Sequence, residues 1–411
     1  MIKQEQIRLM KGLIKHLDSG TNVDAGGIIK NPVDTYTSVD RFNLEWEKFF
    51  QDYPQIIGMS GDLPEPNSFV TINDFNAPII ATRDSQGKFR AFYNVCTHRG
   101  SVIEQEQSGV KAKFTCPFHA WTFNNEGDLI GYPRKEHFGK IDKECYKLTE
   151  LPCLEKHGFL WVHPNPKGEI NIDELFGDEL NEEFTSWGNF DKMVRSHGDE
   201  YITDMNWKLA IDTFGETYHF QFIHKDSLFE NVYGNLQMFD TFKRNARSII
   251  CKRDMDEIRK LPEEEWSILH AALPIYYLFP NIIFIPTVEG AFFIKVYPLE
   301  NSPHKCVSKI SFYFHPEVIE IANKMGVWNT NKKLGSKFSI PEDQNPLQAV
   351  ATVFGEVIRD EDFAVAEKAY KGIRSGNIKN LTFGRNEQPL HFYHNTYREV
   401  LGLEKLPLLE A

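Results

Sequence analysis

Two short cysteine–histidine pairs constrain the fold of this chain more than any other feature. One residue separates Cys96 from His98, two residues separate Cys116 from His119, and 17 residues (99–115) lie between the pairs. Each pair has the spacing of a chelating claw, so we expect one metal site to tie the two segments together. The flanking residues are rich in β-branched and aromatic types, which predicts that both claws lie at the ends of β-hairpins.

Two kinds of metal centre use two thiolates and two imidazoles. A [2Fe–2S] cluster with two Cys on one iron and two His on the other needs this donor set. A structural zinc ion accepts the same donors. Zinc modules usually place one pair on a helix, whereas here both pairs lie in a β-rich context, with Gly100 and Pro117 suited to tight loops. The sequence therefore favours the iron–sulfur cluster and leaves zinc as the alternative.

A second group of metal-binding residue types lies far downstream. His219 and His224 are five residues apart, a spacing that fits one face of a regular helix poorly, so we expect a local distortion or a helix end that brings both imidazoles to one ion. Two His and one carboxylate on one face of Fe(II) leave positions open for O2 and substrate. Asp362 is the predicted carboxylate and Asp360 the reserve. Core histidines and a solvated acidic helix face are the structural alternatives.

The periodicity of the chain predicts an α+β protein with two domains. Residues 1–20 have the apolar spacing of an amphipathic helix, and another short helix is expected over 44–51. Strands are predicted over 68–72, 77–83, 89–95, 113–117 and 159–164, followed by a linker at 164–168. Beyond the linker we expect helix over 204–224, antiparallel strands within 275–297 and 305–315, and a long helix over 345–374.

Composition narrows the classes of function. The 46 Lys and Arg against 58 Asp and Glu give a net charge of −12, which argues against nucleic-acid binding. No secretory signal or membrane span is expected, which predicts a cytoplasmic protein. Six Cys in 411 residues are too few for a disulfide scaffold. The four Cys outside the claws are predicted to be buried thiols: Cys145, Cys153, Cys251 and Cys306.

Taken together, these motifs resemble the alpha subunits of Rieske non-haem iron oxygenases, the family of aromatic-ring hydroxylating dioxygenases and related mono-oxygenases and demethylases. The resemblance extends over nearly the whole chain, and Asn206-Trp207-Lys208 looks like the family's lead into the mononuclear site. It implies that Glu216 is the carboxylate bridging the two centres, a position usually held by Asp. It further implies a [2Fe–2S] cluster on Cys96, His98, Cys116 and His119, and Fe(II) on His219, His224 and Asp362.

The resemblance also implies the architecture and the partners. An all-β Rieske domain (41–168) is expected inside a helix-grip catalytic domain of the Bet v1-like or START-like kind (1–40 and 169–411), in a head-to-tail homotrimer. His119 of one subunit would then reach Glu216 of the next. The chain has neither a G-x-G-x-x-G fingerprint nor a ferredoxin Cys run. We therefore expect a separate NAD(P)H-dependent reductase, with or without a ferredoxin.

The predicted function is that of a terminal oxygenase component, which hydroxylates or oxidatively demethylates a small organic substrate with O2. Glu216 and Asp212 are the predicted catalytic carboxylates, and Asp212, Phe220 and Ile358 are expected to line the pocket. The alternatives are an aromatic-ring cis-dihydroxylating dioxygenase, a non-catalytic Rieske electron carrier and a zinc hydrolase or binding protein. The resemblance includes members with Glu at the bridging position that act on trimethylammonium substrates, and other members with Glu whose substrates are unknown. Aromatic acids would need an Arg or Lys clamp, and quaternary amines an aromatic cage.

Overall fold

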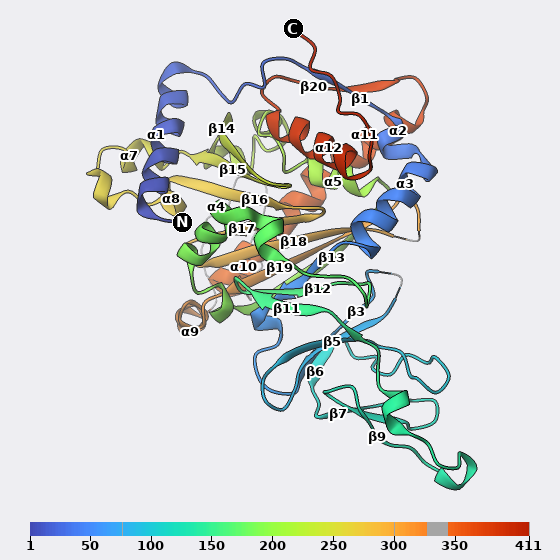
Figure 1. Cartoon of the computed structure of the whole chain (residues 1–411). Coiled ribbons are helices and arrows are strands. Elements are labelled where there is room, and N and C mark those ends of the chain that lie inside the picture. Colours follow the sequence, from blue (N-terminus) through green and yellow to red (C-terminus); the bar gives the residue numbers. More distant parts are fainter. Residues whose placement is uncertain (76, 300, 327–343, 411) are drawn as a thin grey trace. The chain divides into compact units, whose positions relative to one another are not determined.

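The structure is a computed structural model that describes residues 1–75, 77–299, 301–326 and 344–410 (Figure 1). Contacts divide the chain into two compact units. The smaller unit comprises residues 46–172 and 188–194, and the larger comprises residues 1–45, 173–187 and 195–411. The smaller unit thus lies within the sequence of the larger one.

The smaller unit is built from three antiparallel sheets in the part of the chain that the structure describes. Phe69, Phe114 and Trp121 pack in its core, and the two Cys of the claws lie in the same cluster. The first sheet has the order β10-β5-β4-β3-β6: Glu150–Leu151, Phe89–Tyr93, Ile79–Arg83, Ser68–Ile72 and Ser108–Val110. The other two are β11-β12-β2 (Cys153–Lys156, Phe159–Val162, Gln55–Met59) and β7-β8-β9 (Lys113–Thr115, Thr122–Asn124, Leu129–Gly131).

The strands predicted from residue types are present in this unit. The strand over 68–72 has the predicted bounds, and the other four lack two predicted residues at one end. Two of the shortened ends precede the claws, because the chain leaves β5 before Cys96 and β7 before Cys116 to form loops.

The larger unit is organised around a seven-stranded sheet with the order β13-β19-β18-β17-β16-β15-β14, antiparallel from β19 to β14. The strands predicted within 275–297 form parts of three elements, because the chain reverses at 279–281 and at 287–289. The strand bounds are Val194–Thr203, Cys306–Phe314, Gly290–Pro298, Ile282–Pro286, Ala272–Leu278, Asn245–Lys252 and Val232–Phe242, in sheet order.

One long helical stretch packs against this sheet. It consists of α10 (Pro346–Val357), a π-helical segment (Ile358–Phe363) and α11 (Ala364–Arg374), so the helix predicted over 345–374 is confirmed. Asn345 caps its start in a capping box with Gln348. The ring centroid of Phe354 lies 4.6 Å from that of Phe292 on β18 and 6.1 Å from that of Phe312 on β19. The predicted α+β helix-grip arrangement is therefore present (Figure 1).

Other helices complete the larger unit. The predicted amphipathic helix is α1 (Lys3–Ser19), which buries Leu9 and Leu13 against the β14 and β15 region. It is capped by Gly20, a left-handed residue (φ 61°). The remaining elements are α2 (Asp34–Thr37), α3 (Val39–Glu45), α4 (Ile172–Trp187), α5 (Trp207–Asp212), α6 (Phe220–Ile223), α7 (Met255–Ile258), α8 (Ile268–Ala271), α9 (Pro316–Met325), α12 (Gln388–Val400), and strands β1 (Ile29–Pro32) and β20 (Asn380–Phe383). Among the described residues, no helix is both long enough and apolar enough to cross a bilayer.

Candidate metal centres and active-site cavity

The segment that carries the downstream histidines is not the continuous helix that we predicted over 204–224. Helix α5 ends at Asp212 and α6 begins only at Phe220. The Glu216 carboxylate accepts the backbone N–H groups of Tyr218 and His219, and such local hydrogen bonds compete with helical ones. The break places His219 and His224 at the two ends of the four-residue helix α6, which is the kind of distortion that their spacing predicts.

His219, His224 and Asp362 converge on one point. Each offers one ligand atom, and these atoms all lie within 4.8 Å of one another. The Nε2 atoms of His219 and His224 lie 3.4 Å and 3.3 Å from Asp362 Oδ1. Two imidazoles and one carboxylate on one side of a point are the donor set of a facial Fe(II) site.

Two further carboxylates contact the second ring nitrogen, Nδ1, of each imidazole. Glu216 Oε1 contacts Nδ1 of His219, and Glu361 Oε2 lies 2.7 Å from Nδ1 of His224. Ser227 Oγ donates to the same Glu361 oxygen at 2.6 Å. Because a carboxylate accepts at each Nδ1, each ring carries a proton there and turns its Nε2 toward Asp362. This orientation suits metal binding through Nε2 once no proton remains on that nitrogen.

The electrostatics of the three-residue cluster favour a bound cation. Burial lowers the pKa of His219, but contacts with Asp362 and Glu216 outweigh it and raise the pKa to about 10. Burial raises the pKa of the Asp362 carboxyl, and the two histidines reverse this and bring the pKa below its usual value. His219 Nε2 is buried and has no hydrogen-bond partner among the described residues. A metal ion would satisfy this nitrogen and replace the proton, so the residues fit the group.

A cavity of about 310 Å³ opens onto this cluster. Glu216 and all three cluster residues line it, and so do the predicted Phe220 and Ile358. Most of the remaining lining is apolar, contributed by strands of the sheet and by the helix that carries Asp362. A mostly apolar cavity with a few convergent polar groups has the character of a small-molecule site.

Two predicted residues lie elsewhere. Asp212 is absent from the described lining; its carboxylate accepts from Tyr36 Oη at 2.6 Å and lies 2.9 Å from His394 Nε2. Asp360, the reserve ligand, is exposed and pairs with Arg359 at 2.7 Å. The π-helical segment therefore directs Asp362 inward and Asp360 outward.

The Asn206-Trp207-Lys208 segment anchors α5 rather than lining the cavity. The Asn206 side chain caps the helix by accepting from the backbone N–H of Lys208. Glu45 accepts from Lys208 Nζ at 2.6 Å and from Trp207 Nε1 at 3.2 Å. Burial lowers the pKa of Lys208 to about 8, although Glu45 opposes the shift. The segment fixes the helix that leads into the histidine-bearing turn.

In the smaller unit, the loops that carry the two claws have matching hydrogen bonds. The N–H of Cys96 donates to Ser101 O and its carbonyl accepts from Gly100, both at 2.8 Å. The N–H of Cys116 donates in the same way to Trp121 O at 2.8 Å, and its carbonyl accepts from Ala120 at 2.9 Å. Gly100 (φ 76°) and Ala120 (φ 55°) are both left-handed, and this conformation lets each loop turn within five residues.

The four donor residues of the claws lie together. The rings of His98 and His119 have centroids 4.8 Å apart, and His98 stacks on Trp121 at 4.7 Å. The Cys96 sulfur is buried and contacts Cys116. Burial is the largest cause that raises the pKa of the Cys96 thiol, and the contact with Cys116 also raises it. His119 Nδ1 is buried without a hydrogen-bond partner among the described residues. Two buried sulfurs and an imidazole nitrogen without a partner fit a cluster bound between the loops.

The other cysteines follow the prediction only in part. Cys251 and Cys306 are buried and Cys153 is half-buried, but Cys145 is exposed, so its predicted burial is wrong. Cys145 lies in a short helical turn at the surface, where few apolar residues cover it.

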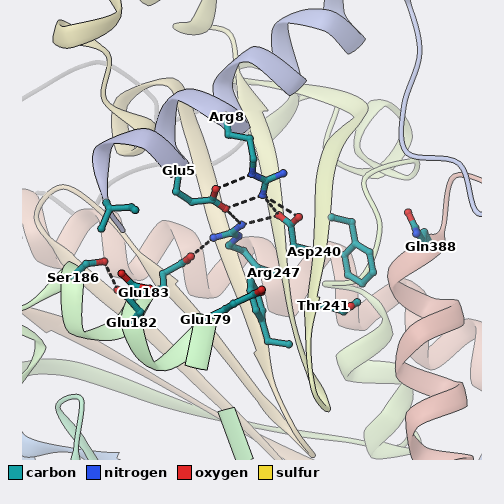
Figure 2. A pocket seen from close by; sticks show the side chains of 13 residues that line it. Glu5, Arg8, Glu179, Glu182, Glu183, Ser186, Asp240, Thr241, Arg247 and Gln388 are labelled. Atoms are coloured by element: carbon teal, nitrogen blue, oxygen red, sulfur yellow. Dashed lines mark hydrogen bonds and ion pairs between the residues drawn. The ribbon is translucent and has the colours of Figure 1, made fainter. Parts of the chain in front are cut away.

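A larger cavity, of about 620 Å³, lies beside α1 and α4 (Figure 2). Five of its charged side chains form one network: Arg247 contacts Glu183 and lies 2.7 Å from Asp240. Arg8 joins Glu5 at 2.7 Å and Asp240 at 2.9 Å. These pairs tie α1 to the sheet, which gives the five side chains a structural role.

Comparison with known families identifies the catalytic part of the chain. Residues 190–403, more than half of the sequence, match the family described as ring hydroxylating alpha subunit (catalytic domain). The chain belongs to this family. Residues 54–153 match the Rieske [2Fe–2S] domain. The predicted cofactors of this ring hydroxylating alpha subunit, a Rieske [2Fe–2S] cluster and a mononuclear iron, are confirmed by these matches.

Individual relatives resemble parts of this ring hydroxylating alpha subunit. The carnitine monooxygenase oxygenase subunit of Acinetobacter baumannii is 31% identical over 45% of this chain and 49% of its own length. The anthranilate 1,2-dioxygenase large subunit of Acinetobacter baylyi is 27% identical over 48% of this chain and 43% of its own. The chain spans about half the length of these curated relatives. The solved quaternary ammonium Rieske monooxygenase CntA shares the fold, with a TM-score of 0.73, 20% identity and coverage of 92% and 96%.

Proposed function

We propose that this chain is the terminal oxygenase component of a multicomponent enzyme. It would take electrons from a separate NAD(P)H-dependent reductase, with or without a ferredoxin, and use O2 to hydroxylate or oxidatively demethylate a small organic substrate. The main support for this proposal is the cluster of His219, His224 and Asp362 on the wall of an apolar cavity, in a chain that also has a Rieske domain.

The residue assignments belong to the same proposal. Cys96, His98, Cys116 and His119 would hold the [2Fe–2S] cluster, and His219, His224 and Asp362 would hold Fe(II). Residues 41–168 would act as the electron-accepting domain and residues 1–40 and 169–411 as the catalytic domain. In a homotrimer, Glu216 would connect the cluster domain of a neighbouring subunit to His219, whose Nδ1 it contacts.

The chain's own residues would prepare the site for the oxidation. The iron supplies the oxygen-activating chemistry when bound. Glu216 and Glu361 hold the Nδ1 protons of the two imidazoles and fix both rings. The apolar cavity wall excludes water and orients the substrate. Asp212 would act by position: held by Tyr36 and His394, it fixes the end of α5 from which the turn to Glu216 starts.

The alternative functions explain fewer of the observed sites. An electron carrier would use the Rieske domain but would need neither the second metal cluster nor the cavity. A zinc hydrolase would leave the Rieske domain without a purpose. Aromatic-ring cis-dihydroxylation remains the second candidate, because the anthranilate 1,2-dioxygenase large subunit is among the relatives.

The test combines metal content with turnover. The purified protein should contain iron at both centres, absorb visible light as a Rieske cluster does, and consume O2 with a surrogate reductase only when a substrate is present. Aromatic acids and methylated amines form the screening panel, and product analysis separates hydroxylation, demethylation and dihydroxylation. Zinc alone, or a reduced cluster that never passes electrons to a second iron, would contradict the proposal.

A further inference from the structure

Lys252 is a cationic side chain in the wall of the apolar cavity. It is the last residue of β15, where it pairs with Val232 at the start of β14. Lys252 and Val232 both line the cavity that the metal-binding cluster also lines. Because these elements belong to the larger unit, the placement of Lys252 at the cavity depends on that unit alone.

The charge of Lys252 has no close counter-ion. Its Nζ donates to the carbonyl of Leu269 at 2.7 Å, and among the described residues it forms no ion pair with a carboxylate. Burial lowers the pKa of Lys252, and the more distant Glu289 and Asp254 oppose the shift. Both carboxylates are exposed, so water screens their charges. An ammonium group with unused donors beside an apolar cavity would gain free energy from an anion.

The remaining lining suits an apolar substrate body. Phe214, Phe220, Phe292 and Phe354 contribute aromatic rings, and the other strand positions contribute Leu and Ile side chains. Lys252 is the only Lys or Arg in the described lining, which also contains the carboxylates of Glu216, Asp254 and Asp362. Glu216 and Asp362 contact the metal-site histidines, and Asp254 is exposed to water. A substrate with an apolar body and one carboxylate would therefore pair its charge with Lys252 and its body with the apolar wall.

We propose that the substrate is a small carboxylate and that Lys252 binds its carboxylate group, with the apolar body lying among the phenylalanines. This inference rests on the proposed oxygenase function and specifies its substrate class. It makes Lys252 a specificity-determining residue, which touches the substrate at a position other than the reacting atom.

A structural role and a substrate-binding role for Lys252 predict different effects of the same substitutions on ligand preference. If Lys252 served only to bind the Leu269 carbonyl in α8, then Lys252→Gln, which can still donate there, would leave ligand preference unchanged. If Lys252 binds a carboxylate, Lys252→Gln removes the preference for acids, whereas Lys252→Arg retains much of it. Lys260→Gln is the matched control, because this nearby lysine is exposed and outside the lining.

The experiment is calorimetric titration of the anaerobic holoenzyme with four acid and amide pairs: butyrate and butyramide, hexanoate and hexanamide, benzoate and benzamide, phenylacetate and phenylacetamide. At least one acid should bind the parent protein roughly 10- to 100-fold more tightly than its amide. Lys252→Gln should abolish this difference, and Lys260→Gln should keep it. If the acids bound directly to iron instead of to Lys252, Lys252→Gln would keep the preference for acids, which distinguishes the two kinds of binding.

The inference is wrong if no acid of the panel binds better than its amide, or if Lys252→Gln keeps the preference. Iron content and cluster absorbance of the same samples report on the oxygenase function separately. If the protein prefers acids through Lys252 but lacks a second iron, the carboxylate site is supported and the proposed oxygenase function is contradicted. If it has both iron centres and no preference for acids, only the carboxylate site is contradicted.

Discussion

Glu361 and His224 form a buried pair, with Glu361 Oε2 2.7 Å from His224 Nδ1. The next residue, Asp362, faces Nε2 of the same ring at 3.3 Å. Two consecutive acidic residues therefore hold the two nitrogens of one imidazole, one as an orienting partner and the other as a neighbouring metal ligand in our proposal.

Removing the orienting partner should weaken metal binding. Glu361→Ala leaves the Nδ1 proton of His224 and the hydroxyl of Ser227 without their shared acceptor, so we expect roughly 10- to 100-fold lower affinity for the mononuclear iron. Competition with an iron chelator measures the affinity. Asp360→Ala is the control, because Asp360 is exposed and pairs with Arg359. Equal iron retention in both variants would contradict the role of Glu361.

Glu216→Gln should slow electron delivery more than it weakens iron binding. Glu216 contacts Nδ1 of His219 and is not a member of the three-residue cluster. We expect iron content near that of the parent and at least about a tenfold slower oxidation of the reduced cluster in a single turnover with substrate and O2. Glu387→Gln is the control, since this nearby carboxyl accepts from Gly384 and contacts neither histidine in the described contacts. An unchanged rate in Glu216→Gln would remove the bridge from the proposal.

Mixed oligomers test electron transfer between subunits. Cys116→Ser removes a proposed cluster ligand and His219→Ala a proposed iron ligand, so each variant alone should be inactive. Co-expressed and purified together, they should regain part of the parent's substrate-dependent O2 uptake, because an intact cluster would face an intact iron site across some interfaces. His219→Ala alone should keep the visible spectrum of the cluster. No recovery in verified mixed oligomers would favour transfer within one subunit.

The ion network around α1 predicts a loss of stability in acid. The hydrogen bond from Arg8 is the largest cause that lowers the pKa of Glu5; burial opposes it, Arg247 adds to it, and the result is a pKa of about 2 instead of 4.5. Because the folded pKa is depressed, Glu5 stabilises the fold above pH 4.5 and this contribution is lost as the pH falls toward 2.

Denaturation of the parent and of Glu5→Gln between pH 3 and 7 checks this. The parent should exceed the variant by roughly 1–3 kcal/mol in free energy of unfolding at neutral pH, and the gap should narrow in acid. Glu264→Gln, at an exposed position, should leave the profile unchanged. A gap between parent and Glu5→Gln that is independent of pH would assign the effect to packing.

The sequence predicted many of the helices and strands, because each leaves a local pattern of residue types along the chain. The apolar positions of α1 follow the period of a helix, and short β-branched or aromatic runs mark the strands at residues 68–72 and 159–162. The spacing of His219 and His224 fits a shared helix face poorly, and the structure places them at the two ends of the short helix α6, after a break in the helix at residues 213–219. The acidic cluster in the predicted C-terminal helix offered the partner of these histidines, Asp362, and the family resemblance implies the same residue.

Other features depend on contacts that a sequence does not display. Asp212 resembles a cavity residue because it precedes the histidines by a few positions, yet Tyr36 and His394, from the two ends of the chain, hold it elsewhere. Glu361 was missed because consecutive residues of a regular helix point in different directions. Lys252 was missed because its position in the cavity wall follows from the register of β14 and β15.

The π-helical segment has a consequence for how this protein can vary. The wider turn at residues 358–363 lets Glu361 and Asp362 both face inward, which a regular α-helix would prevent. Deleting one residue there would restore regular winding and rotate either the acidic pair or all of α11 by about 100°. Length changes in this helix should therefore be tolerated far less than substitutions on its outer side.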